Sequence, residues 1–343
     1  MTTTLADVGG PAQPLLTVRG LSKYFPLKNG ATVRAVDGVD FEVLKGETLG
    51  VVGESGCGKS TTARLLMHLM DPTRGELVFD GRTVGSRDLP LKEFRRQVQM
   101  VFQDSYASLN PRLTIEDSIA FGPQVHGVSR KESVARAHHL MDRVGLAPSR
   151  FAERYPHELS GGQRQRINIA RALALQPRMV ILDEAVSALD KSVEAQVLNL
   201  LSELKREFGL TYVFISHDLG VVHYISDRVM VMYLGQVAEI GPSDALFQKP
   251  AHPYTEALLS SVPSMDPAHR TQVAPLAGDP PNPIQPPSGC RFHPRCAQAA
   301  PVCSQRAPAF STVQLHHHVH CLMHEAGSGH PLAPAASSLA VAA

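Results

Sequence analysis

The stretch "GVVGESGCGKST", from Gly50 to Thr61, has the spacing of a phosphate-binding loop, G-x-x-x-x-G-K-[ST]. A strand-like run, "TLGVV", precedes it and a helix-favouring run, "TARLLMHLM", follows it. Glycines let such a loop close around phosphate groups, with N–H groups at a helix N-terminus pointing at the anion. We expect Lys59 to reach the β- and γ-phosphates and the Ser60 hydroxyl to bind Mg²⁺. The residues expected to bind nucleotide here are Gly53, Glu54, Ser55, Gly56, Cys57, Gly58, Lys59, Ser60 and Thr61.

A second candidate site follows the apolar run "MVIL", where Asp183 and Glu184 stand side by side. Acidic residues in this position are expected where a buried strand emerges at its carboxyl end. Asp183 can hold Mg²⁺, and Glu184 can orient and polarise an attacking water molecule. An acidic pair alone is more often a solvated strand end. Because the same chain has a complete phosphate loop, we interpret this pair as catalytic.

The composition excludes several classes of protein. The 343 residues allow one large domain with an appendage, or two ordinary domains, and 43% apolar content supplies a core. A net charge of +1 gives no electrostatic footprint for nucleic acid. We find no apolar run of the ~18 residues needed to span a membrane, and the N-terminus lacks the features of a secretory signal. We therefore expect a cytosolic protein with no nucleic-acid partner.

Strand-like and helix-like segments alternate along the chain, which indicates an α/β fold with a largely parallel sheet. From about residue 90 to 165 the sequence turns polar and helix-favouring, as in "RKESVARAHHLMDRVGL", which predicts a helical insertion. Residues 1–14 are expected to be a disordered leader. After about Pro250 the chain becomes rich in Pro, His and Cys, and residues 325–343 are expected to form a disordered tail.

The segment "ELSGGQRQRINIARALA", which starts at Glu158, resembles the signature of ATP-binding cassette (ABC) ATPases. The resemblance covers roughly residues 15–250 and implies a P-loop NTPase cassette, with a RecA-like core, an antiparallel β subdomain and a helical subdomain. It also implies roles for residues outside the phosphate loop. Phe25, or its neighbour Tyr24, matches the aromatic residue that stacks on adenine, and Gln103 the glutamine that contacts the metal beside Ser60 and Asp183. His217 matches the switch histidine, which joins Glu184 and Lys59 as catalytic, and Asp190 the D-loop. Many cassettes have Pro-Thr where this chain has Ala185-Val186.

The resemblance further implies a dimer of two cassettes arranged head to tail. Ser160, Gly161, Gly162 and Gln163 form the signature, and Ser160 and Gly162 would contact the γ-phosphate held by Lys59 of the other cassette. The partner is expected to be a second ABC ATPase, either the D-type subunit of a heterodimer or a second copy of the chain.

Two further stretches, "FQDSYASLNPRLTI" and "AHPYTEALLSSVP", resemble ATPases of dipeptide and oligopeptide importers, and the first looks like the F-type subunit. This implies a C-terminal domain over residues 251–324, two separate permease subunits, an extracytoplasmic solute-binding protein, and a place on the cytoplasmic face of the membrane. The expected function is ATP-driven uptake of peptides or related small solutes. The alternative is a soluble ABC ATPase in translation or DNA repair.

Four of the five cysteines, Cys290, Cys296, Cys303 and Cys321, lie near the end of the chain. Their spacing is wider than the C-x₂₋₄-C pairs usual for structural zinc. Four thiolates suffice for a [4Fe–4S] cluster, and the resemblance to peptide-importer ATPases favours such a cluster, with zinc or unligated thiols as alternatives. We expect this segment to be a structural staple with no part in hydrolysis. The fifth, Cys57, is expected to be a small space-filling residue.

Overall fold

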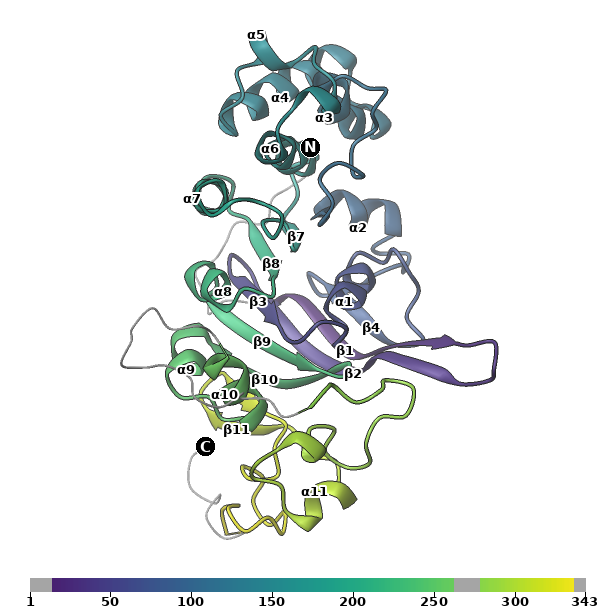
Figure 1. The fold of residues 1–343 in the computed structure, drawn as a ribbon. Helices are drawn as coiled ribbons and strands as arrows, with labels where there is room; N and C mark the ends of the chain where they lie inside the picture. Colours follow the sequence, from purple (N-terminus) through teal and green to yellow (C-terminus); the bar gives the residue numbers. More distant parts are fainter. Residues whose placement is uncertain (1–13, 262–277, 336–343) are drawn as a thin grey trace.

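The computed structural model describes residues 14–261 and 278–335, and in these ranges the chain forms two sheets with helices packed against them (Figure 1). Apart from Pro14, the leader expected at residues 1–14 lies outside the described residues, as does the last part of the expected tail, 336–343. Residues 325–335 are described, and they pack: Ser328 and His330 are buried, and His330 Nε2 lies 3.0 Å from the carbonyl oxygen of Gln298.

The smaller sheet is antiparallel and has the strand order β2-β1-β4-β5. Alternating apolar residues such as Leu16, Val18 and Phe79 are buried, as expected for strands with one face on a core. Its strands are β1 (Pro14–Pro26), β2 (Thr32–Leu44), β4 (Arg74–Phe79) and β5 (Arg82–Thr83).

The larger sheet has the order β11-β12-β10-β9-β3-β8-β7-β6, and β9, β3, β8, β7 and β6 run parallel. Its parallel strands are β3 (Thr48–Val52), β6 (Val98–Val101), β7 (Met179–Asp183), β8 (Thr211–Ile215) and β9 (Arg228–Tyr233); the antiparallel ones are β10 (Gln236–Pro242), β11 (Ser311–Gln314) and β12 (His317–Val319). Strands β3, β7 and β8 are buried throughout, which explains their continuous apolar runs.

Successive residues of these buried strands face two different hydrophobic cores. Leu182 and Phe214 belong to one core, and Ile181 and Val213 belong to the other. Because parallel strands end at the same edge of a sheet, the residues that follow β3, β7 and β8 are brought together there.

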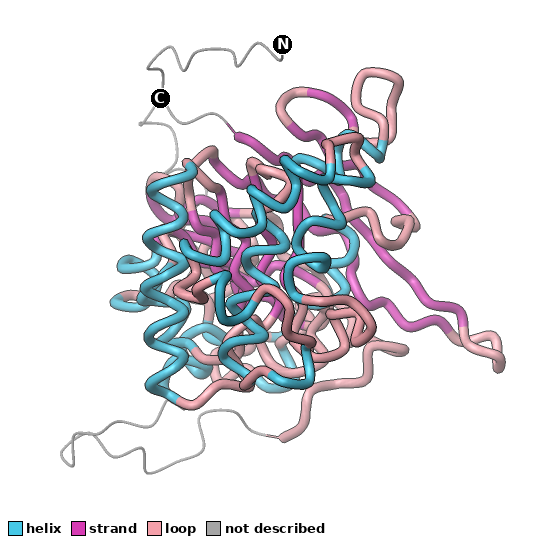
Figure 2. The backbone as a smooth tube through the Cα atoms, turned by 90° about the horizontal axis from the view of Figure 1, so that it is seen from above, coloured by secondary structure: helices cyan, strands magenta, loops and turns pink. Residues whose placement is uncertain are grey.

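Helices cover the sheet when the molecule is seen from above (Figure 2), and one group of them stands apart from it in the side view (Figure 1). The group apart contains α3 (Ile115–Val125), α4 (Arg130–Arg143), α5 (Pro148–Phe151) and most of α6 (Gly161–Leu173), with η1 (Pro156–Glu158) before α6. Closer to the sheets lie α1 (Lys59–Leu66), α2 (Leu91–Gln97), α7 (Lys191–Phe208) and α8 (Leu219–Ile225). The range 90–165 thus contains α3, α4, α5 and only the start of α6, which continues to Leu173, together with α2 and strand β6 of the large sheet.

The C-terminal part is tied to the large sheet through β12, which pairs with β10. At this junction the fully buried Glu239 accepts hydrogen bonds from the N–H groups of Ala251 and His252, at 2.8 and 3.0 Å, and lies 2.6 Å from His317 Nε2. The remaining elements are α9 (Ser243–Gln248), α10 (Pro253–Ser260), η3 (His293–Arg295) and α11 (Pro301–Gln305).

Candidate nucleotide site

The predicted phosphate loop joins β3 to α1, and two of its glycines are required by the backbone. Gly58 has φ of 109°, and a Cβ there would lie 2.3 Å from the carbonyl oxygen of Ala35. At Gly53, with φ of 148°, a Cβ would lie 2.2 Å from the carbonyl oxygen of Met232. Cys57 is buried beneath the loop, and burial raises the pKa of its thiol, so it is a space-filling residue rather than a reactive thiolate.

Lys59 begins α1 and is buried, with its ammonium group turned toward the loop. Its Nζ donates to the carbonyl oxygens of Gly53 and Glu54, at 2.6 and 3.1 Å. Among the described residues it forms no ion pair with a carboxylate. A buried cation without a counter-charge is costly, so this arrangement favours an anion such as a phosphate group.

Ser60, next in α1, lies against the acidic pair at the end of β7. Its Oγ donates to Asp183 Oδ1 at 3.2 Å. Burial raises the pKa of Asp183, and the neighbouring charge of Glu184 raises it further. A hydroxyl and a buried carboxylate are oxygen ligands of the kind Mg²⁺ prefers, so these two residues fit the expected metal site.

Glu184 lies between Gln103 and His217, two of the other residues predicted from the sequence. Gln103 Nε2 donates to Glu184 Oε2 at 2.8 Å, and His217 Nδ1 lies 3.6 Å from the same oxygen. Glu184 has φ of 49°, a left-handed conformation that is rare outside glycine. Its N–H donates to the carbonyl oxygen of Ile215 at 2.9 Å, which holds the strained residue against the end of β8.

The two aromatic residues considered for adenine stacking have different surroundings at the end of β1. Tyr24 donates its hydroxyl hydrogen to Asp37 and is half-buried. Phe25 is 37% exposed, with Lys23 Nζ 5.5 Å from its ring centre. Phe25 is therefore the more exposed of the two rings.

The predicted signature forms the N-terminus of α6, in the helical group and apart from α1 (Figure 1). The Ser160 side chain accepts from the Gln163 N–H, and the Gln163 side chain accepts from the Ser160 N–H, at 3.3 and 3.0 Å. This capping box orients a helix end whose first N–H groups have no partner within the helix. Asp190 caps α7 with its own side chain alone: the carboxylate accepts from the N–H of Val193 at 3.0 Å, and this hydrogen bond lowers the pKa of Asp190.

The four C-terminal cysteines are free thiols. Burial, with a contribution from neighbouring thiols, raises the pKa of Cys290 to about 11 and that of Cys321 to about 12. Within residues 14–261 and 278–335, however, no group of three or more His, Cys, Asp or Glu side chains is arranged to hold a metal ion. The structure therefore does not support the expected iron–sulfur or zinc site at Cys290, Cys296, Cys303 and Cys321.

Sequence reasoning missed two contacts that C-terminal residues make to the phosphate loop. Tyr254 Oη accepts from the N–H of Glu54 at 2.9 Å, and Arg295 binds the Glu54 carboxylate. The only signals in the sequence were the "HPY" motif and the basic residues of "CRFHPRC", which identify neither partner.

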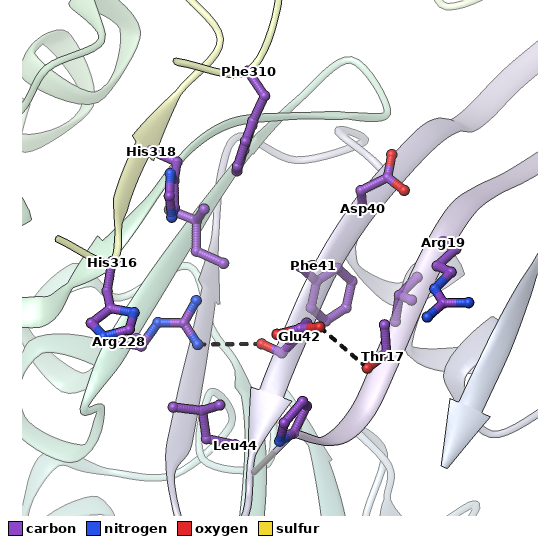
Figure 3. Close-up of a pocket in the computed structure, with 13 residues that line it drawn as sticks. Thr17, Arg19, Asp40, Phe41, Glu42, Leu44, Arg228, Phe310, His316 and His318 are labelled. Carbon is purple, nitrogen blue, oxygen red and sulfur yellow. Dashed lines mark hydrogen bonds between the residues drawn. The ribbon is translucent and has the colours of Figure 1, made fainter. Parts of the chain in front are cut away.

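A groove of about 570 Å³ lies elsewhere, between the smaller sheet and the last hairpin (Figure 3). Thr17, Glu42, Arg228, Phe310 and His318 are among its lining residues, and Arg228 donates to the backbone oxygen of Glu42 at 3.3 Å. None of the residues predicted to bind nucleotide or catalyse hydrolysis lines this groove.

Comparison with known proteins identifies the family of this chain. The family model described as ABC transporter matches residues 36–187. The oligopeptide transport ATP-binding protein AppF of Bacillus subtilis is 50% identical over 321 residues, covering 90% of this chain and 97% of that protein. The chain belongs to the ABC transporter ATPases.

Other matches agree with this assignment. The C-terminal region of oligopeptide/dipeptide transporters matches residues 238–303. A probable peptide ABC transporter ATP-binding protein of Sinorhizobium fredii is 53% identical over 302 residues, covering 86% of this ABC ATPase and 85% of that protein. The predicted resemblance to importer ATPases is thus confirmed.

Solved structures support the cassette fold. cbiO1 from Clostridium perfringens, part of the ABC transporter complex cbiONQ, aligns with a TM-score of 0.61 and 27% identity, covering 69% of this chain and 91% of that one. An ATP-binding cassette solved as a dimer in a post-hydrolysis state with ADP and Pi aligns with a TM-score of 0.59 and 29% identity, covering 66% and 98%. The predicted α/β cassette fold and ATPase class are therefore confirmed. Within the part of this ABC ATPase that the structure describes, no helix has the length and apolar character to cross a membrane.

Proposed function

We propose that this ABC ATPase is the motor subunit of an importer that takes up di- and oligopeptides or related small solutes through separate permease subunits. The observation that carries the proposal is the convergence of the phosphate loop, Asp183, Glu184, Gln103 and His217 at one edge of the large sheet. The names of the relatives and the match to the C-terminal region of peptide transporters support the class of cargo. They do not favour the alternative role in translation or DNA repair.

In this proposal the chain's own groups hold ATP and activate water. N–H groups of residues 53–61 and the Lys59 ammonium bind the phosphates, while Phe25 stacks on adenine. Glu184 takes a proton from the attacking water, whose oxygen bonds to the γ-phosphorus as the bond to the β-phosphate oxygen breaks, giving ADP and phosphate. Gln103 and His217 orient Glu184 through the contacts described above. Mg²⁺, held by Ser60 and Asp183 with Gln103 nearby, would neutralise phosphate charge.

We further propose that two cassettes close on ATP in a head-to-tail dimer. Ser160 to Gln163 of one cassette then face the γ-phosphate bound by the other, because unsatisfied N–H groups at the start of α6 favour an anion. Asp190, at the start of α7, lies beside the same interface. The partner is a second ABC ATPase, a D-type subunit or another copy of the chain.

Gly162→Ala should lower ATP hydrolysis by the dimer about 5- to 100-fold, because a Cβ at Gly162 would lie 2.5 Å from Val193 Cγ1. Keeping the signature in place for closure of the dimer then costs roughly 1–3 kcal/mol, and each 1.4 kcal/mol lowers the population of the closed, active dimer about tenfold. Steady-state phosphate release measures the effect. Because the clash is with one side chain, Gly162→Ala combined with Val193→Ala should recover most of the rate. A double variant no faster than Gly162→Ala would contradict the steric explanation.

The permeases are proposed to dock on the helical group, where Phe121 and Val125 of α3 are 59% and 56% exposed and lie one helical turn apart. Adjacent exposed apolar residues of this kind suit an interface. Such a site fits a subunit bound peripherally to the cytoplasmic face of the membrane.

Phe121→Asp should reduce solute uptake in cells about tenfold or more, since hot-spot truncations cost at least ~2 kcal/mol. Basal ATP hydrolysis by the purified subunit should stay unchanged. Phe208→Asp is the matched control, because Phe208 is 40% exposed at the far end of α7. Equal uptake by the two variants would place the docking surface elsewhere.

Uptake of labelled peptides compared with nickel, in a strain from which this gene is deleted, tests the cargo. We expect peptide uptake to fall and to return when the gene is restored. Copurification with ribosomes and unchanged uptake would instead favour the soluble alternative.

Anaerobically purified protein tests whether the four cysteines bind a metal. Broad absorbance near ~400 nm together with bound iron would indicate a cluster, and bound zinc would indicate a zinc site. Protein that contains no iron and no zinc would indicate unligated thiols.

A further inference from the structure

Arg295, one residue before Cys296, binds the phosphate loop through a bidentate ion pair. Its Nη1 donates to Glu54 Oε2 at 2.7 Å, and its Nη2 donates to Glu54 Oε1 at 3.0 Å. The two side chains are only 6% and 20% exposed. Fork-to-fork geometry fixes the orientation of both partners, and shielding from water makes the attraction stronger than at an exposed surface.

Glu54 is held a second time by the same C-terminal region. Its N–H donates to Tyr254 Oη at 2.9 Å. Tyr254 is fully buried, with ring centres of Tyr233 and Phe292 at 4.6 and 5.3 Å. Phe292 belongs to the same short segment as Arg295, so the aromatic cluster and the ion pair form one contact surface against the loop.

A second arginine of this segment contacts residues that in turn bind the phosphate loop. Arg291 donates to the carbonyl oxygen of Leu234 and to the carboxylate of Asp37. The adjacent Gly235 donates to the carbonyl oxygen of Cys57 at 2.8 Å. The segment between Cys290 and Cys296 thus contacts the loop directly at Glu54 and indirectly at Cys57.

The charge of Glu54 gives this contact a consequence for nucleotide binding. A carboxylate within a phosphate-binding loop repels the anionic phosphates of ATP unless a cation compensates it. The Glu54 carbonyl also accepts from Lys59 Nζ, so movement of Glu54 would disturb the lysine that is proposed to bind phosphate. A loop that is ordered before ATP arrives avoids part of the entropic cost of binding.

We propose that Arg295 is a positioning residue of the nucleotide site: by neutralising and anchoring Glu54, it sets the affinity of the phosphate loop for ATP. This rests on the proposal that the loop binds ATP. It gives the cysteine-flanked segment a part in ATP binding, whereas the sequence predicted only a structural role for it.

The test measures nucleotide affinity of the full chain by titration with fluorescent ATP and ADP analogues. Arg295→Met keeps the length of the side chain and removes the charge, and should weaken ATP binding about tenfold or more, with a smaller loss for ADP, which carries less negative charge. Arg306→Met is the matched control, because Arg306 pairs with Glu325 inside the C-terminal part, and its affinity should equal that of the wild type.

Glu54→Gln combined with Arg295→Met should recover most of the lost affinity, because the uncompensated carboxylate is gone. A purely structural anchor would show no such rescue. Should Arg295→Met not fold, Arg295→Lys carries the test, since it keeps the charge without the fork and should bind ATP less tightly than the wild type. Unchanged affinity in the folded arginine variants, or a double variant no better than Arg295→Met, would overturn this inference alone. Wild-type protein that binds no ATP would overturn the proposed function and this inference with it.

Discussion

Glu184→Gln should lower steady-state ATP hydrolysis at least about 100-fold while ATP still binds. General-base catalysis contributes roughly 10²–10⁴ in rate, and an amide cannot accept the proton of the attacking water. The substitution keeps the size of the side chain, so the left-handed backbone at Glu184 and its N–H contact to Ile215 need not change. Phosphate release gives the rate, and titration with a fluorescent ATP analogue gives the affinity, which should stay within about threefold of the wild type.

Glu203→Gln is the matched control, since Glu203 is an exposed glutamate on α7 and the chemical change is the same. It should hydrolyse ATP at the wild-type rate. A Glu184→Gln protein that retained more than about a tenth of the wild-type rate would show that another group accepts the proton. A large loss of ATP affinity would instead indicate that Glu184 acts in binding.

The fold and much of the candidate site could be predicted because their signals are local. The phosphate loop is a continuous motif, and the apolar runs before Gly53, Asp183 and His217 predict buried parallel strands. Parallel strands end at a common edge, so the meeting of Ser60 with Asp183, and of Glu184 with Gln103 and His217, follows from topology.

The contacts of the C-terminal segment could not be predicted in this way. Glu54 and Arg295 are 241 positions apart, and no motif or spacing in the sequence predicts that they form a pair. Their pairing depends on how β12 docks on β10 and on how the aromatic cluster of Tyr233, Tyr254 and Phe292 packs. The prediction of a metal site from the cysteines fails for the same reason, because ligand geometry depends on tertiary packing. Their number suggested four ligands, yet the described residues form no metal site.

The buried ammonium of Lys59 leads to the second large effect. Lys59→Met should weaken ATP binding about 30-fold or more, because truncating one partner of a buried charge pair costs roughly 2–5 kcal/mol. Nucleotide-free protein should lose little stability, since methionine fills similar space and the cost of burying a charge disappears together with the two bonds to carbonyl oxygens. Affinity and stability are thus expected to change separately.

Thermal unfolding measured with and without ATP separates the effect on ATP affinity from the effect on stability. At an ATP concentration of about 100 times the wild-type Kd, binding adds about 2.7 kcal/mol of stability, and a site about 30-fold weaker would add about 0.9 kcal/mol or less. Lys205→Met is the matched control. Lys205 of α7 is half-buried and pairs with Asp227, just before β9, and with Thr48 of β3, so its loss should lower stability and leave the full gain from ATP. If Lys59→Met kept that gain as well, the phosphates would have to be bound by the backbone N–H groups of the loop, and the ammonium group would serve only to fasten Gly53 and Glu54 in place.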